Sequence, residues 1–246
     1  MNIYGLIGRS LGHSFSEKYF FEKFQKENIS GCVYRNFELK DLEKEVPELK
    51  ENSALRGLNV TIPYKTDIIS FLDEISDEVK EINACNCIKI KDGKWKGFNT
   101  DIIGFERSFV PHLKPFHKSA LIVGTGGASN AVACVLKKLN IDFLKVSRNK
   151  TESASVISYE DLSEEEMKQF QIVINTTPLG TFPNVNEFPP LPYELITNQY
   201  YFFDLVYNPS KTMFLSLAQK HGAVIENGAQ MLAIQAEESW KIWNED

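Results

Sequence analysis

Long apolar runs, basic charge and a signal sequence are all lacking in this chain of 246 residues. No stretch is apolar and long enough to cross a bilayer, so we expect no membrane association. The first residues lead directly into polar ones, without the basic segment and apolar core of a secretory signal. The formal net charge is −6, which argues against nucleic acid as the main partner. These features favour a cytoplasmic protein that binds neither nucleic acid nor membranes.

Cysteines are few, and their spacing does not indicate a metal site. Only Cys85 and Cys87 lie close together among the four, and no second close pair completes a zinc site. The nucleophile-elbow motif of a hydrolase is absent as well. We therefore expect reduced cysteines and no bound metal.

Strand and helix patterns alternate along the chain, whose apolar content of 43% is typical of a globular protein. In the first half we expect strands at 2–7 and 57–62, a helix at 15–26 and a hairpin at 87–98 around Asp92-Gly93. Ser14 and Glu17 fit a capping box at the start of that helix. In the second half, predicted strands at 120–123, 143–146, 172–174, 201–206 and 223–225 alternate with helices at 128–139 and 230–243. The second half therefore predicts a parallel, doubly wound sheet.

A glycine-rich turn follows the apolar run at 120–123. Gly124 permits a tight turn, and Gly126 lets the backbone approach a pyrophosphate. The N-terminus of the next helix supplies N–H groups and a partial positive charge for that anion. Ser129 stands where the usual fingerprint has its third glycine. The order of strand, glycine turn and helix predicts a Rossmann-type dinucleotide site.

The residues after the second strand of this unit indicate which dinucleotide binds. NAD enzymes usually carry an acidic residue here, which holds the ribose 2′-hydroxyl. This chain has Ser147-Arg148-Asn149-Lys150 instead. Arg148 would pair with a 2′-phosphate through charge-assisted hydrogen bonds, so we predict NADP. The alternative is that Arg148 is an ordinary exposed arginine in a loop.

Four polar segments of the first half carry the remaining candidate residues. They are His13-Ser14-Phe15-Ser16, Asn59 to Lys65, Asn83 to Asn86, and Gly97 to Asp101. Together with the glycine turn at Gly124 and the run from Asn227 to Ala236, they resemble the shikimate dehydrogenase family, in order and in spacing. The patterns Asn-Val-Thr-x-Pro-x-Lys and Asn-Thr-Asp are the most specific pieces. The resemblance covers nearly the whole chain.

The resemblance implies reversible, NADPH-dependent reduction of 3-dehydroshikimate to shikimate, on the pathway to chorismate and the aromatic amino acids. Lys65 matches the catalytic lysine of the family, with Asp101 as its partner. The positions that match substrate-binding residues are Ser14, Ser16, Thr61, Asn86, Asp101, Tyr207 and Gln235. The expected cofactor-binding residues are Gly124, Thr125, Gly126, Gly127, Ala128, Ser147, Arg148, Asn149 and Gly228.

The chemistry of these residue types agrees with that assignment. When a hydride leaves a ring carbon, the hydroxyl on that carbon loses a proton, and a general base must lie at the oxygen. Lysine can do this if its pKa is lowered, and its ammonium donates in the reverse direction. Ser14 and Ser16 at a helix start suit a substrate carboxylate. Asn59 and Thr61 are expected on one face of a strand, so that Thr61 presents its hydroxyl beside Lys65.

The implied architecture has two α/β domains. The substrate-binding catalytic domain is expected to comprise residues 1–103 and 228–246, because the C-terminal helix returns to it. The Rossmann NADP-binding domain is expected at 104–227. The active site is expected in the cleft between the two domains.

Alternatives remain open on the sequence alone. Singly, Ser14 could be only a helix cap, Lys65 a surface lysine, and Asn86 a bridge between turn backbones. Glu17 stands where the family usually has proline, and Glu152 lies near the place where some relatives carry a second arginine. The chain could also be a quinate or quinate/shikimate dehydrogenase that uses NAD, or a folate-linked dehydrogenase. A non-catalytic nucleotide-binding regulatory module of the same fold is disfavoured by the presence of Lys65 and Asp101.

Overall fold

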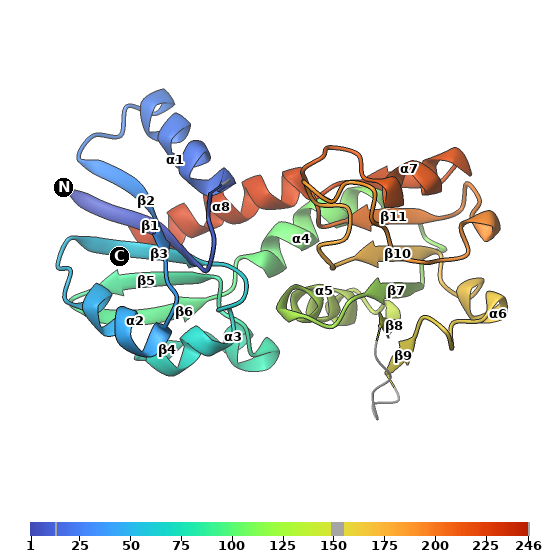
Figure 1. Cartoon of the computed structure of the whole chain (residues 1–246), viewed down its shortest axis with the longest axis horizontal. Coiled ribbons are helices and arrows are strands. Elements are labelled where there is room, and N and C mark those ends of the chain that lie inside the picture. The colour runs from blue at the N-terminus through green and yellow to red at the C-terminus, as the bar shows by residue number, and fades with distance from the viewer. Residues whose placement is uncertain (13, 149–154, 246) are drawn as a thin grey trace. The chain divides into compact units, whose positions relative to one another are not determined.

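The computed structural model describes residues 1–12, 14–148 and 155–245. The chain divides into two compact units, one formed by Met1–Thr100 with Ala236–Asp246 and the other by Asp101–Gln235. Both units are α/β in composition (Figure 1). This division cuts the last helix, α8 (Ala229–Asn244), so that its final turns belong to the first unit and its first turns to the second.

The first unit is built on a mixed sheet of six strands. The strands are β1 (Asn2–Gly8), β2 (Cys32–Glu38), β3 (Leu55–Val60), β4 (Glu74–Ile75), β5 (Cys87–Lys91) and β6 (Lys94–Phe98), in the order β2-β1-β3-β5-β6-β4. β1 runs parallel to β2 and β3, whereas β5 is antiparallel to β3 and β6. The predicted hairpin is confirmed, because Asp92 and Gly93 adopt φ values of 52° and 76°, as a type I′ turn requires.

Each face of this sheet is covered by helices. Apolar residues of α2 (Leu42–Lys50) and α3 (Asp77–Ile82) pack on one face, and those of α1 (Phe15–Lys26) and the end of α8 pack on the other. Cys85 lies in the first of these cores and Cys87 in the second, because Cys85 precedes β5, which begins at Cys87. On the α8 face, the rings of Phe20 and Tyr34 stack with centroids 4.5 Å apart.

One strand ends earlier than the sequence predicts. β3 ends at Val60 rather than at residue 62, and Ile62 is 70% exposed instead of packing beside Leu58. Pro63 has no N–H for a sheet ladder, and the chain turns here, with the Tyr64 N–H donating to the Thr61 carbonyl at 3.0 Å. Thr61 therefore lies just beyond the strand, although its N–H still donates to the Ile7 carbonyl of β1 at 2.9 Å.

The second unit has a fully parallel sheet of six strands. They are β7 (Ser119–Val123), β8 (Asp142–Ser147), β9 (Val156–Ser158), β10 (Ile172–Asn175), β11 (Tyr201–Asp204) and β12 (Val224–Glu226), in the order β12-β11-β10-β7-β8-β9. The order reverses beside β7, which is the doubly wound arrangement predicted.

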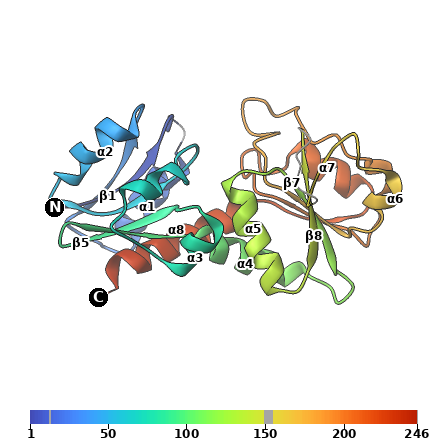
Figure 2. The ribbon, with the colours of Figure 1, turned by 90° about the horizontal axis from the view of Figure 1, so that it is seen from below.

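Helices lie on both faces of this second sheet. Figure 2 shows α4 (Asp101–Phe109) and α5 (Gly127–Lys138) on one side and α6 (Glu164–Met167) and α7 (Met213–Lys220) on the other. The central strands β7, β10 and β11 are therefore shielded from water, and their residues are almost wholly apolar.

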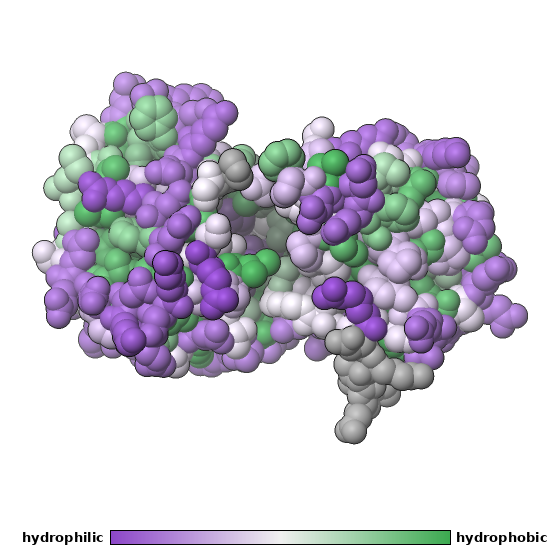
Figure 3. All heavy atoms as spheres, in the orientation of Figure 1, coloured by the Kyte–Doolittle hydropathy of each residue, from purple (hydrophilic) through white to green (hydrophobic). Residues whose placement is uncertain are grey.

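Hydrophilic side chains cover much of the visible face of each unit, with apolar ones scattered among them (Figure 3). Within the described part of the chain, no helix combines the length and the apolar character needed to cross a bilayer.

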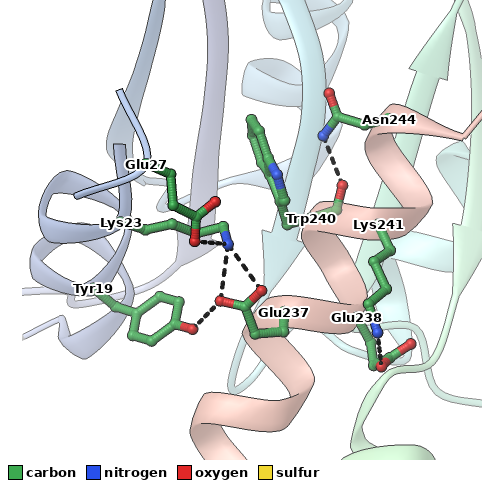
Figure 4. Close-up of polar contacts among 8 residues, drawn as sticks. All are labelled: Tyr19, Lys23, Glu27, Glu237, Glu238, Trp240, Lys241 and Asn244. Atoms are coloured by element: carbon green, nitrogen blue, oxygen red, sulfur yellow. Dashed lines mark hydrogen bonds and ion pairs between the residues drawn. The ribbon is translucent and has the colours of Figure 1, made fainter. Parts of the chain in front are cut away.

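A charged cluster joins α1 to α8 within the first unit (Figure 4). The ammonium of Lys23, a buried residue of α1, lies 2.9 Å from the Glu237 carboxylate and 2.7 Å from that of Glu27. The Tyr19 hydroxyl also donates to Glu237. Burial raises the pKa of Glu237, but the hydrogen bonds from Tyr19 and Lys23 and the charge of Lys23 outweigh it, so the pKa lies below its ordinary value of 4.5.

Replacing Glu237 by alanine is expected to lower the free energy of unfolding by about 1–3 kcal/mol, less than for a fully buried pair because water screens the carboxylate and Glu27 remains. Urea denaturation followed by circular dichroism measures this. Because the carboxyl pKa is lowered, the stabilisation is present above pH 4.5 and is lost as the pH falls through the lowered value. The difference from the parent chain should therefore narrow in acid.

The matched control is Lys241→Ala, which removes the more exposed ion pair between Lys241 and Glu238 on the same helix. It is expected to cost no more than about 1 kcal/mol. Equal losses in the two variants would show that the Lys23 cluster contributes no more than a surface pair.

Candidate functional site

The start of α1 carries the serines predicted to bind a carboxylate. Ser14 is the N-cap, and its side chain accepts a hydrogen bond from the Glu17 N–H at 3.4 Å. Ser16 lies in the first turn and is buried beside the hydroxyl of Tyr34 in β2. Both serines therefore lie beside the positive end of a helix of 12 residues, where an anion is stabilised.

Only half of the predicted capping box forms. The Glu17 carboxylate accepts a hydrogen bond from the Asn36 side chain at 2.7 Å. The reciprocal bond of a capping box would instead run from the Ser14 N–H, which donates to the Leu11 carbonyl. Glu17 is thus held toward β2 by a neutral amide.

Lys65 lies in the turn that follows β3. The Thr61 N–H donates to the Ile7 carbonyl at 2.9 Å, and the Lys65 carbonyl accepts from the Cys85 N–H at 2.7 Å. Between them, the buried Tyr64 donates its hydroxyl to the Leu39 carbonyl at 2.6 Å. The turn is therefore braced by three neighbouring segments, and Lys65 itself is half-buried.

Asn86 is buried and paired with Thr100. Its Oδ1 accepts from the Thr100 N–H at 2.7 Å, and its Nδ2 donates to the Thr100 hydroxyl at 3.1 Å. Asn99 likewise donates from its side chain to the Ala84 carbonyl at 2.9 Å. These contacts hold the segment before β5 against the chain that enters α4, so both asparagines bridge turn backbones whether or not a ligand is present.

The other three predicted substrate residues belong to the second unit. Asp101 is the first residue of α4 and is 7% exposed. Gln235 on α8 is equally buried and donates to the Leu232 carbonyl at 3.0 Å. Tyr207 is 37% exposed, and burial of part of its side chain raises the pKa of its hydroxyl.

The glycine turn has the predicted form. Gly124 has a φ of +110°, and a Cβ there would lie 2.6 Å from the Thr176 hydroxyl, so the turn requires glycine. Gly126 is the N-cap of α5 and has no side chain to cap the first N–H groups, while a Cβ on it would meet open space. Gly127 and Ala128 open the helix, following Thr125. A pyrophosphate fits this arrangement.

The end of β8 carries the predicted specificity residues. Ser147 is its last residue, and Arg148, which follows, is exposed. Burial raises the pKa of the nearby Tyr159 to about 12, against the opposing charge of Arg148. Asn149 lies outside the described residues. Gly228 is buried, and its N–H donates to the Val206 carbonyl at 3.1 Å.

Two polar residues near these segments were not predicted from the sequence. The Lys145 ammonium donates to the Asn130 side chain at 2.9 Å, in the first turns of α5, and burial lowers its pKa. Asp204 ends β11 and accepts from Asn175 at 2.9 Å and from the Thr212 hydroxyl at 2.5 Å. Burial raises the pKa of Asp204 to about 6, although these hydrogen bonds oppose the change. The sequence offered a signal for both residues: Lys145 interrupts the apolar run at 143–146, and Asp204 directly follows the apolar run at 201–203.

Asp204 orders the chain on either side of Tyr207. Its carboxylate also accepts from the Val206 N–H at 3.0 Å, and Thr212 is the N-cap of α7. The loop that carries Tyr207 is thus tied to the sheet at both ends. No cluster of three or more potential metal ligands occurs among the residues that the structure describes.

Comparison with known proteins gives a consistent result. The family model described as the shikimate dehydrogenase substrate binding domain matches residues 6–88. A relative from Caldicellulosiruptor bescii, named shikimate dehydrogenase (NADP(+)), is 38% identical over 255 residues, which cover 97% of this chain and 88% of the relative.

Solved structures agree over nearly the whole chain. Shikimate dehydrogenase 1 from Peptoclostridium difficile is 36% identical, covers 99% of this chain and 91% of its own, and has a TM-score of 0.85. Shikimate 5-dehydrogenase from Thermus thermophilus, solved in complex with NADP(H) and shikimate, is 27% identical with the same TM-score, over 99% of this chain and 94% of its own. Since both units and the segments that carry the predicted residues are shared with these proteins, the chain belongs to the shikimate dehydrogenase family.

Proposed function

We propose that this chain catalyses the reversible, NADPH-dependent reduction of 3-dehydroshikimate to shikimate. The observation that carries the proposal is the match to NADP(+)-dependent shikimate dehydrogenases along 97% of the chain. The chain is accordingly an NADP-dependent oxidoreductase. A small molecule is its substrate, and we extend the proposal to a cytoplasmic monomer or homodimer that binds neither nucleic acid nor membranes, in keeping with the net charge of −6.

The substrate carboxylate is proposed to bind at the start of α1. Ser14 and Ser16 supply hydroxyl groups there, and the helix end supplies a partial positive charge. The negative charge of Glu17 would oppose an anion. Its carboxylate is hydrogen-bonded by Asn36, which lowers the cost of holding it near that end of the helix.

The proton is proposed to pass through Lys65. In the direction of reduction, its ammonium donates to the oxygen of the substrate carbonyl, and the neutral amine takes the proton back in the reverse direction. Asp101 is proposed to orient Lys65 and the substrate. Thr61, Asn86, Tyr207 and Gln235 are proposed to hold the ring hydroxyls and the carboxylate, and thereby fix which ring carbon reacts.

The cofactor is proposed to lie on the glycine turn. The N–H groups at the start of α5, from Gly126 to Ala128, bind the pyrophosphate, with Gly124 and Thr125 forming the turn. Ser147, Arg148 and Asn149 take the 2′-phosphate end, and Gly228 lies against the nicotinamide end. When bound, NADPH supplies the hydride.

The proposed reaction is tested by assaying the purified chain with shikimate and with quinate, each with NADP and with NAD. We expect the absorbance of reduced nicotinamide to rise fastest with shikimate and NADP. Preference for quinate or for NAD would favour the quinate/shikimate alternative, and no turnover with any pair would favour a non-catalytic module.

Replacing Lys65 by alanine is expected to lower kcat by about 10²–10⁴-fold, because the proton loses its carrier. The KM for shikimate should change little. Lys44→Ala, at an exposed position on α2, is the matched control and should leave both constants unchanged. A near-normal kcat in the Lys65 variant would refute the assigned role.

Replacing Arg148 by alanine is expected to raise the KM for NADP by about 10–100-fold, through loss of charge-assisted hydrogen bonds to the 2′-phosphate. The KM for NAD, which lacks that phosphate, should be nearly unchanged. Lys168→Ala, an exposed cation of the same unit, is the control. Equal effects on both cofactors would show that Arg148 does not contact the phosphate.

A further inference from the structure

A chain of buried hydrogen bonds crosses the first unit and ends at Asn86. The Tyr34 hydroxyl of β2 donates to Asn59 Oδ1 on β3 at 2.9 Å. Asn59 Nδ2 then donates to the Ser239 hydroxyl of α8 at 2.9 Å, across 180 residues of sequence. The Ser239 and Thr100 hydroxyl oxygens lie 3.2 Å apart, and Thr100 is paired with Asn86. We refer to Tyr34, Asn59, Ser239 and Thr100 as the relay.

Thr100 links the relay to the Asn86 amide. The Ser239 oxygen accepts from Asn59, and either hydroxyl of the contact between Ser239 and Thr100 can be its donor. Asn86 Oδ1 accepts from the Thr100 N–H at 2.7 Å, and Asn86 Nδ2 donates to the Thr100 hydroxyl at 3.1 Å. The position of Thr100 therefore sets which way the Asn86 amide is turned.

Apolar packing does not require the hydroxyl group of Tyr34 or of Ser239. Ser239 is completely buried next to the aromatic residues of α8, a position where alanine would fill almost the same space. Tyr34 is 6% exposed, and its ring already stacks on Phe20, as phenylalanine would. Burying a hydroxyl is unfavourable unless it is hydrogen-bonded, so the value of these two groups lies in the bonds that they make.

The relay also lies close, in space or in sequence, to other residues proposed to bind substrate. The Tyr34 hydroxyl lies beside the Ser16 side chain. Thr100 directly precedes Asp101, and Ser239 lies four residues after Gln235, on the same face of α8. The relay therefore contacts Asn86, directly precedes Asp101 in sequence, and lies beside Ser16 and one helical turn from Gln235.

We infer that Tyr34 and Ser239 are positioning residues, which hold the amide of Asn86, through Asn59 and Thr100, in the orientation that binds the ring acid. The inference rests on the proposed function. Preformed orientation lowers the cost of ordering side chains when the substrate binds, so its loss raises KM. The proton carrier and the dinucleotide turn are untouched, so kcat and the KM for NADP stay near those of the parent.

The test is the kinetics of Tyr34→Phe, Ser239→Ala and the double variant, with shikimate and NADP. Each single change is expected to raise the KM for shikimate about fivefold, the effect of one lost buried hydrogen bond, with kcat within about twofold of the parent. Because the relay acts as one unit, the double variant should raise KM no further than the larger single effect.

Matched controls exist in the second unit. Ser108→Ala removes a fully buried helical hydroxyl that bonds carbonyls of its own helix, Gly104 and Phe105, at 2.9 and 3.1 Å. Tyr193→Phe removes a buried phenol that donates to the Pro189 carbonyl at 2.9 Å. Both should leave the KM for shikimate unchanged.

The outcomes separate the two proposals. An active parent with unchanged KM in Tyr34→Phe and Ser239→Ala would overturn the relay and leave the enzyme assignment intact. A KM for shikimate in the double variant that rises by the product of the two single effects would also overturn the relay, because it would indicate two independent losses. A rise in the KM for NADP equal to that for shikimate would overturn it as well, because it would indicate a general structural loss. If Ser239→Ala does not fold, the more conservative Tyr34→Phe decides. A parent chain without shikimate turnover would overturn both proposals.

Discussion

A buried amide must find partners for both its oxygen and its nitrogen, and in the first unit Asn59 meets this requirement on several elements at once. Its Oδ1 accepts from Tyr34, and its Nδ2 donates to Ser239 and, at 3.3 Å, to the Asn86 carbonyl. Any shift of α8 along the sheet would leave at least one of these polar groups unpaired. The amide therefore sets the register of the last helix against strands formed early in the chain.

The second unit depends on a different constraint, which is that all strands of its sheet run in the same direction. Parallel strands bring their carboxyl ends to one edge, so β7 and β8 deliver the glycine turn and Arg148 to the same edge. The positive φ of Gly124 and the uncapped start of α5 follow from the need to leave the strand abruptly. Asp204 holds the next part of that edge, and its pKa, raised to about 6 by burial, reflects a carboxylate largely removed from water.

Local charge, rather than net charge, distinguishes the proposed binding residues. The chain is acidic as a whole, yet the start of α1, the start of α5, Lys65 and Arg148 each present positive potential to an anion. Glu17 is the exception, and its bond to Asn36 accounts for a carboxylate in the first turn of α1. Glu17, which stands where the family usually has proline, thus has a hydrogen-bonding partner in Asn36 on β2.

Much of the fold was predictable from sequence because its signals are local. The bounds of α1, the Asp92-Gly93 hairpin, the glycine turn and the alternation of strands in the second half all arise from side chains within a few residues of one another. The edge strand β2, whose residues alternate irregularly, and α2, which contains Pro47, gave no clear period and were not predicted. The roles of the predicted site residues rest on resemblance, and they stay predictions.

What the sequence alone determined is therefore the alternation of strands and helices in the second half, the dinucleotide turn and the family. Only the tertiary structure decided that Thr61 leaves the strand, that Glu17 turns to Asn36, and that Lys23 pairs with Glu237. Only the tertiary structure joined Tyr34, Asn59 and Ser239. The physical reason is that a buried polar group can be satisfied by any donor or acceptor that the fold brings near, and sequence periodicity carries no information about a partner 180 positions away.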